Sequence, residues 1–190
     1  MTRRLMFVAM MTVGFGLMAT GCAPKMTIEE MKAHMPQRPA ELDKLNAFVG
    51  QWTFEGEGKM AGVEESLKTS GENEAVWGPD RWFIVSNESF TMGELGSMKG
   101  LGTWTYDAKA GKYRSLWVDT MGGTGTGTMS HDEKTNTWRM KACSHGAMGD
   151  TTMKGTVRFT DPNTMEWEMT EYAMLGLMKT MEMKGTSRRK

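Results

Sequence analysis

From Gly50 to the C-terminus, apolar and polar residues alternate along the chain, with no long helical pattern between the alternating runs. The clearest run places Met165, Trp167 and Met169 on one side of an extended chain and Glu166 and Glu168 on the other. Such a run predicts a strand with one buried face and one wet face. Comparable runs cover residues 50–59, 64–77, 81–91, 98–107, 112–120, 123–131, 136–144, 150–160, 164–173 and 177–189.

Short turn-forming segments separate these runs, as in Gly78-Pro79-Asp80 and Asp161-Pro162-Asn163. Short connections imply that neighbouring strands are antiparallel. About ten consecutive strands predict an all-β, up-and-down sheet, and closure into a barrel removes the two edges that such a sheet would otherwise expose. The seven tryptophans are spread almost one per strand, so large side chains are expected to line the interior. Two alternatives stay open: these side chains fill the barrel, or they leave space for one small ligand.

The first 22 residues predict export and lipidation. Arg3 and Arg4 precede an uncharged apolar run that ends in small residues and then Cys22. This order resembles a bacterial lipobox, in which cleavage after Gly21 leaves Cys22 as the lipidated first residue. An uncleaved membrane anchor is the alternative, but a span needs about 20 apolar residues and the run at 5–19 is shorter.

We therefore divide the chain into a signal peptide at 1–21, a lipidated cysteine with a tether at 22–40, and a barrel domain at 41–190. Ala23 stands where an aspartate would signal inner-membrane retention. The expected location is thus the outer membrane, facing the periplasm. Without Arg3 and Arg4 the chain has 21 basic and 23 acidic residues, a net charge of −2 that does not favour nucleic acid as a partner. The membrane, through Cys22, is the expected partner.

Two short helices are predicted before the barrel. Thr27 and Glu30 form a capping-box pattern. Further on, Pro39 is expected in the first turn of a second helix, with Leu42, Leu45 and Phe48 on one face. This second helix should lean on the barrel and lead into its first strand.

Gly50-Gln51-Trp52, just after that helix, resembles the GxW motif of lipocalins and other calycins. The resemblance implies a structural role for Trp52, packed at the closed end of the barrel against a basic residue from the last strand. Arg188 or Arg189 is the candidate partner, and we assign Arg188 to that role.

A longer stretch, residues 100–122, resembles a bacterial family known as domain-of-unknown-function family 1579. The shared features are the first-strand tryptophan, a glycine-rich turn leading to Arg81, the Tyr106-Asp107 hairpin, the Trp117-Val-Asp119 strand and a basic tail. The likeness covers about residues 42–190 and implies a calycin-like barrel, with no established activity. Pro79-Asp80 replaces the glycine that typically precedes the arginine.

The family-like positions Arg81, Tyr106 and Asp119 are our predicted ligand-binding residues, with Trp117 as a wall of the site. Trp117 and Asp119 are two residues apart and so share a face of their strand. A buried, ionised Asp119 would need a partner, and Arg81 is the expected one. The alternative is that Arg81 and Asp119 form a structural ion pair that fixes strand register.

No catalytic residue is predicted, because His34, His131 and His145 lie near no nucleophile motif. No cofactor is predicted either: haem-binding ten-stranded barrels place an axial histidine in a late strand, and no histidine follows His145. Seventeen methionines remain after residue 21, but they are dispersed through the strands rather than clustered, so no copper site or other metal site is expected. Cys143 is expected to be a small buried side chain.

These observations favour a lipid-anchored envelope protein that binds a small apolar ligand inside its barrel. The alternative is a structural or partner-binding envelope lipoprotein with a filled barrel. An enzyme and a Cu(I)-binding protein are the remaining hypotheses. An open, tryptophan-lined interior distinguishes the first from the second.

Overall fold

The computed structural model describes residues 26–147 and 149–190, so the predicted signal peptide and Cys22 lie outside the described residues. The chain divides into two compact units, residues 1–37 and residues 38–190. In the first unit, α1 (Ile28–Ala33) begins with the expected capping box, in which the Thr27 hydroxyl accepts from the Glu30 amide and the Glu30 carboxylate accepts from the Thr27 amide. No helix among the described residues is long and apolar enough to cross a membrane.

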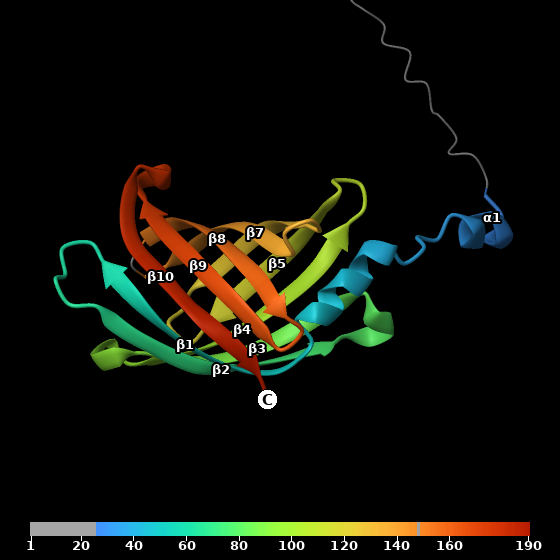
Figure 1. Cartoon of the computed structure of the whole chain (residues 1–190). Helices are drawn as coiled ribbons and strands as arrows, with labels where there is room; N and C mark the ends of the chain where they lie inside the picture. Colours follow the sequence, from blue (N-terminus) through green and yellow to red (C-terminus); the bar gives the residue numbers. More distant parts are fainter. Residues whose placement is uncertain (1–25, 148) are drawn as a thin grey trace, which may run out of the picture. The chain divides into compact units, whose positions relative to one another are not determined.

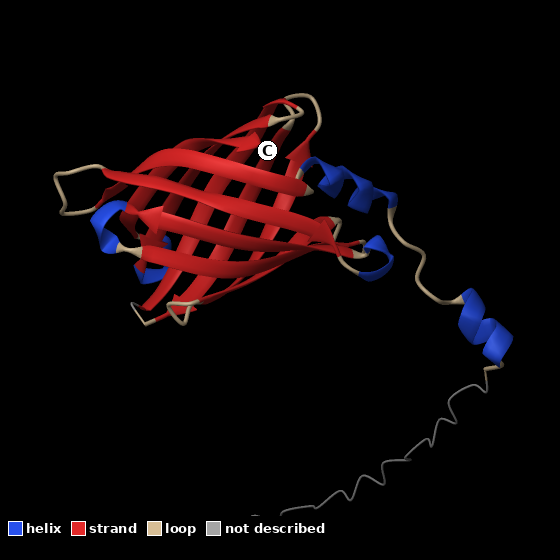
Figure 2. Ribbon diagram, turned by 90° about the horizontal axis from the view of Figure 1, so that it is seen from below, coloured by secondary structure: helices blue, strands red, loops and turns tan. Residues whose placement is uncertain are grey.

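The second unit is a closed antiparallel barrel in which each strand pairs with the next and β1 pairs with β10 (Figure 2). The predicted all-β, up-and-down barrel is therefore confirmed. Residues 38–190 contain the whole barrel and its core, which is what a domain needs to fold alone. The strands are β1 (Gly50–Met60), β2 (Leu67–Trp77), β3 (Phe83–Met92), β4 (Ser97–Asp107), β5 (Lys112–Asp119), β6 (Thr124–Asp132), β7 (Thr137–Gly146), β8 (Gly149–Asp161), β9 (Thr164–Ala173) and β10 (Met178–Arg189).

The alternation of residues along β9 sets which side chains enter the barrel. Glu166 and Glu168 are exposed on the outer wall, whereas Met165, Trp167 and Met169 are partly buried on the inner wall. Trp167 packs against the hydrophobic core. The period of two in the sequence thus determines the inner and outer faces of this strand.

One end of the barrel, here called the plug end, is closed by the helical turn η1 (Ala40–Ala47), which lies at the opposite end from the β1–β2 and β9–β10 turns (Figure 1). The helix is a 3₁₀ helix that starts after Pro39 rather than an α-helix that contains it. Leu42, Leu45 and Phe48 are spaced by three residues, the repeat of a 3₁₀ helix, so they share one face. Leu42 and Leu45 are fully buried in the core.

Aromatic rings complete the core at the plug end. Phe48 makes edge-on contacts with Trp104, Trp138 and Phe159, with ring centroids 4.6, 5.0 and 5.1 Å away. Trp138 is 1% exposed, and Phe159 is 7% exposed. This half of the interior is filled by side chains, which is what the first of the two alternatives predicted for the barrel.

Trp52 is covered by Arg189 and not by Arg188, which corrects the prediction from the sequence. The Arg189 guanidinium lies 4.3 Å from the centre of the Trp52 ring and donates to the carbonyls of Val49 and Ala47, where η1 ends. Arg188 is exposed on the outer wall. The physical reason is strand parity: Trp52 pairs with Arg189 across β1 and β10, so their side chains share the inner face.

Gly50 makes this arrangement possible. Its φ of +129° is one that other residues rarely adopt, and a Cβ there would lie 2.5 Å from the Arg189 guanidinium. The glycine of the GxW motif therefore leaves room for the cation that covers the tryptophan.

Candidate functional site

In the half of the interior farther from η1, here called the rim half, the large aromatic rings stay partly exposed. Phe54, Phe90 and Trp117 face the interior but are not among the buried core residues, unlike Trp52 and Trp138 at the plug end. Because these side chains point inward, their exposure means that solvent reaches the interior of this half. The barrel is thus filled at one end and accessible at the other.

Glycines on the inner wall make space for the large rings of the rim half. A Cβ at Gly100 would lie 2.0 Å from the Trp117 ring, and one at Gly185 would lie 2.4 Å from the Trp167 ring. The rings therefore lie against the wall where a neighbouring strand lacks a side chain. Trp167 also meets Phe54 edge-on, with centroids 6.1 Å apart.

Polar side chains interrupt this aromatic wall on β2 and β3. Asn73 donates through Nδ2 to the Glu88 carboxylate at 2.9 Å and also to the Ser86 hydroxyl. Thr69, which also faces inward on β2, is 5% exposed, and its hydroxyl has no partner within the described chain. We call the inner cup the site formed by these residues and the surrounding rings: Phe54, Thr69, Asn73, Ser86, Glu88, Phe90, Trp117 and Trp167.

Glu88 is the acidic group of the inner cup, and the surrounding barrel wall changes its ionisation. Desolvation raises the pKa of Glu88 above its ordinary value, and the hydrogen bond from Asn73 opposes this only in part. Its Oε1 accepts from Asn73, whereas no hydrogen bond to Oε2 is found among the described residues. A second polar group can therefore bind there, either accepting from the protonated carboxyl or donating to the ionised one.

We expect Glu88→Gln to make thermal stability less dependent on pH. Because the folded state holds the Glu88 proton more tightly than the unfolded chain, the wild type loses stability as the pH rises from about 4.5 through the raised pKa. The melting temperature of Glu88→Gln, relative to wild type, should therefore be higher at pH 7.5 than at pH 4. The outer-wall change Glu55→Gln is the matched control, and a Glu88→Gln difference that stays constant between these pH values would contradict the burial of this carboxyl.

Trp117 and Asp119 share the inner face of β5, as predicted, but they bond to each other and not to Arg81. The Trp117 indole donates to the Asp119 carboxylate at 3.0 Å, and the amides of Met121 and Gly123 donate to it at 2.9 Å each. Burial alone would raise the pKa of Asp119, but the bonds from Gly123, Trp117 and Met121 together lower it. Asp119 therefore holds the β5–β6 turn and orients Trp117.

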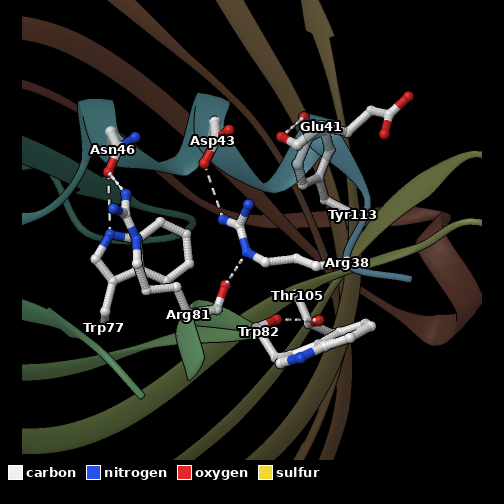
Figure 3. A network of polar contacts seen from close by, with 9 residues as sticks. All are labelled: Arg38, Glu41, Asp43, Asn46, Trp77, Arg81, Trp82, Thr105 and Tyr113. Carbon is white, nitrogen blue, oxygen red and sulfur yellow. Dashed lines mark hydrogen bonds and ion pairs between the residues drawn. The ribbon is translucent and has the colours of Figure 1, made fainter. Parts of the chain in front are cut away.

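Arg81 lies at the plug end, on the turn between β2 and β3, so the predicted pairing of Arg81 with Asp119 is wrong. Its guanidinium donates to Asn46 Oδ1 at 2.8 Å and lies 5.0 Å from the centre of the Trp77 ring (Figure 3). Its carbonyl accepts from Arg38 at 2.8 Å. Arg81 thus fastens η1 to the barrel and does not face the inner cup.

In the turn that contains Arg81, Pro79-Asp80 replaces the glycine that typically precedes this arginine in the resembling family. The backbone of the turn adopts an unfavourable conformation there. Asp80 and Arg81 both have a positive φ, 51° and 56°. Such conformations cost of order 1–3 kcal/mol for residues other than glycine. Two hydrogen bonds hold the chain in this conformation: Arg81 donates to Asn46 on η1, and Arg38 donates to the Arg81 carbonyl in the turn.

Tyr106 also belongs to the filled half. Its ring packs edge-on against Tyr113, with centroids 4.9 Å apart, and the Tyr113 hydroxyl donates to the Glu41 carbonyl at 2.8 Å. Burial raises the pKa of Tyr113 to about 12, so this donor keeps its proton. Of the four predicted ligand-binding residues, the structure places Trp117 in the inner cup, Asp119 behind it, and Arg81 and Tyr106 at the plug end.

Cys143 is exposed on the outer wall of β7, contrary to the expectation of a buried side chain. Its neighbours across the strands are Thr126 on β6 and Thr152 on β8. Within residues 26–147 and 149–190, no three His, Cys, Asp or Glu side chains are grouped closely enough to hold a metal ion.

Solved structures with a similar fold include Rv2717c from M. tuberculosis, at a TM-score of 0.64 and 12% identity over 81% of this chain and 99% of that one. This likeness shows a shared fold. A barrel described as EF1p2_mFAP2b bound to DFHBI aligns at a TM-score of 0.45 and 11% identity over 78% of this chain and 98% of that one. A protein of the DUF3598 family from Nostoc punctiforme aligns at 0.41 and 10%, over 77% and 48%.

No curated protein matches the sequence significantly. The sequence profile of the family described as "Protein of unknown function (DUF1579)" matches residues 37–189. That span includes η1, every strand of the barrel and the Arg189 that covers Trp52. Because the match extends over far more than half of the chain, the protein belongs to the DUF1579 family.

Proposed function

We propose that this protein is a lipid-anchored envelope protein whose barrel binds a small, largely apolar ligand in the inner cup. The observation that carries the proposal is the contrast between the rings of the two halves: Trp52 and Trp138 at the plug end are buried, whereas the aromatic rings of the inner cup remain partly exposed. Ligand sites in proteins typically combine apolar and aromatic walls with a few placed polar groups. Glu88, Asn73 and Thr69 are the polar groups of this cup.

The chemistry of the cup favours a ligand with an apolar body and a single polar end. Phe54, Phe90 and Trp117 offer ring surfaces to the apolar body. The Glu88 oxygen that Asn73 leaves free offers a hydrogen bond to the polar end. A hydroxyl group suits this site, because it both donates and accepts and so binds either ionisation state of Glu88.

Titration of residues 38–190 with the fluorescent probe N-phenyl-1-naphthylamine tests the proposal. We expect a saturable rise in probe fluorescence, and about tenfold weaker binding in Trp117→Ala, because the ring forms one wall of the cup. Leu116→Ala is the matched control: it truncates the adjacent residue of β5, which is 59% exposed on the outer wall. The control should bind the probe as the wild type does.

Competition between two displacing molecules tests the polar end. In the wild type, 1-dodecanol should displace the probe at a lower concentration than dodecane, whereas Glu88→Leu should remove this preference. If no saturable probe signal is seen, or if Trp117→Ala binds the probe as tightly as Leu116→Ala does, the cup does not bind ligands. The filled, structural lipoprotein then remains as the function.

Cys22→Ser tests the anchor, which lies outside the described residues and is supported by the sequence alone. Because thioether acylation requires the cysteine sulfur, the variant should incorporate no labelled palmitate, and its membrane-bound fraction should fall strongly. Cys143→Ser is the matched control and should leave both unchanged. An undiminished membrane-bound pool in Cys22→Ser would show that residues 1–21 remain as an uncleaved anchor instead.

A further inference from the structure

The turns at the two ends of the barrel differ in chemistry. At the end opposite η1, here called the rim, the β3–β4, β5–β6 and β9–β10 turns expose large apolar side chains: Leu95 is 56% exposed, Met121 57%, Leu177 87% and Leu175 98%. At the plug end the β4–β5 and β6–β7 turns consist of Ala, Gly and polar residues, at 108–111 and 133–136. An apolar ring of separate tips therefore surrounds the mouth of the inner cup.

In the β9–β10 turn, the most exposed leucine, Leu175, lies in a backbone conformation that is unfavourable for residues other than glycine. Met174 and Leu175 both have a positive φ, 50° and 58°. Among the described residues, the other pair of adjacent non-glycine residues with this feature is Asp80 and Arg81, which is held by one hydrogen bond from Arg81 to Asn46 on η1 and one from Arg38 to the Arg81 carbonyl. No described contact of that kind holds Leu175, which is almost fully exposed. Strained backbone in proteins is concentrated where it serves a function.

We propose that the rim docks on a lipid bilayer, so that apolar ligands pass between the bilayer and the inner cup without crossing water. The proposal deepens the function proposed above and rests on it for the ligand, but the docking itself does not require a ligand. Separate apolar tips on three hairpin turns suit a fluid, deformable surface, into which each tip inserts independently. A rigid protein partner would instead need one continuous complementary patch.

The charges of the rim indicate what kind of bilayer binding to expect. The turns at residues 61–66, 93–96, 120–123 and 174–177 contain Glu64, Glu65 and Glu94 and no lysine or arginine. Attraction to anionic lipids through basic residues is therefore not available to these tips. Burial of apolar side chains must supply the binding, so neutral phosphatidylcholine vesicles should suffice and salt should have little effect.

The proposed anchor is compatible with this docking. From Cys22 to Arg38 the chain spans 16 residues, which include the six-residue helix α1. At about 3.4 Å per extended residue and 1.5 Å per helical residue, this segment reaches about 40 Å. An 11-residue strand such as β1 is about 36 Å long. The tether is thus long enough for the rim to meet the membrane that holds the lipid.

The test uses residues 38–190 without the lipid anchor, phosphatidylcholine vesicles, and a single environment-sensitive NBD label. In a Cys143→Ser background, the label is placed at Leu175→Cys on the rim or at Leu116→Cys on the outer wall, two positions that are both exposed. Vesicles should shift the emission of the rim label to the blue and leave the outer-wall label unchanged. Vesicle partitioning of the unlabelled variant Leu175→Ser/Leu177→Ser should be at least tenfold weaker than that of the control Leu101→Ser/Leu116→Ser.

Three outcomes overturn the docking: no blue shift at the rim, an equal shift on the outer wall, or binding that needs anionic lipid and disappears at 0.5 M salt. Probe titration of the same samples separates this proposal from the function on which it rests. Retained probe binding without vesicle binding rejects the docking alone and leaves the rim as a surface for a protein partner. Vesicle binding without probe binding supports the docking and rejects the ligand site.

Discussion

Replacing Trp52 with alanine is expected to lower the free energy of unfolding by about 3 to 5 kcal/mol, the usual loss for a large aromatic side chain in a core. Trp52 is 1% exposed, and its indole donates to the Phe48 carbonyl at 2.9 Å. The substitution also leaves the Arg189 guanidinium without the ring that it covers, a cation–π contact of about 2 kcal/mol when desolvated. Urea unfolding of residues 38–190 measures the loss.

Trp117→Ala is the matched control, since it removes the same side chain from the accessible half of the interior. Its loss should be clearly smaller, because the Trp117 ring already contacts solvent on one side. A loss below about 1 kcal/mol for Trp52→Ala would contradict the structural role of this residue. Equal losses for the two variants would contradict the division of the barrel into a filled half and an accessible half.

Leu45→Ala is expected to cost about 2 to 5 kcal/mol, because it leaves a cavity under η1. Leu45 is fully buried and belongs to the same core cluster as Phe48 and Trp138. Alanine keeps a good helical propensity, so the loss reports packing and not the helix itself. The outer-wall control Leu101→Ala removes a leucine that is 40% exposed and should change stability by about 0.5 kcal/mol or less.

Near-UV circular dichroism and probe binding together distinguish two ways in which Leu45→Ala can lose stability. Packing loss confined to the plug end should reduce the aromatic signal modestly and leave probe binding in the inner cup intact. Loss of probe binding together with unfolding at lower urea would show that η1 holds the whole barrel closed. A wild-type stability in Leu45→Ala would contradict the plug altogether.

The strands were predictable because apolar and polar residues alternate with a period of two in a half-buried strand. The run at 164–173 coincides with β9, and the runs elsewhere differ from the observed strands by at most a few residues at their ends. The choice between α and 3₁₀ for residues 40–47 was not predictable in the same way. Over so few residues, the spacing of Leu42, Leu45 and Phe48 fits an α-helix and a 3₁₀ helix equally well. Packing against the barrel decides which of the two conformations forms.

The same rule, carried through to the end of β10, selects Arg189 over Arg188. Gly185 and Ser187 face inward, so the next inward position is Arg189. Parity also places Glu88 on the inner face of β3, between the inward-facing Ser86 and Phe90. A charged residue at an inward position was thus a detectable signal of the inner cup that the family-like motifs did not provide.

The separation of Arg81 from Asp119 could not be read from local sequence. Arg81 lies in the turn between β2 and β3, at the plug end, whereas Asp119 is the last residue of β5, at the rim. Only the order of the strands along the whole chain separates the two residues, because successive turns of an up-and-down barrel lie at alternate ends. What no local pattern provides is the partner of each side chain: Asn46 for Arg81, and Trp117 with two backbone amides for Asp119.

The indole N–H signals of the seven tryptophans in a ¹H–¹⁵N NMR spectrum test the central claim most directly, because the rings report on both halves of the barrel at once. Titration of residues 38–190 with 1-dodecanol should shift the signals of Trp117 and Trp167 in a saturable way and leave those of Trp52 and Trp138 in place. Single Trp→Phe variants assign each signal. No saturable shift, or shifts at Trp52 and Trp138 as large as those at Trp117 and Trp167, would contradict a ligand site in the inner cup.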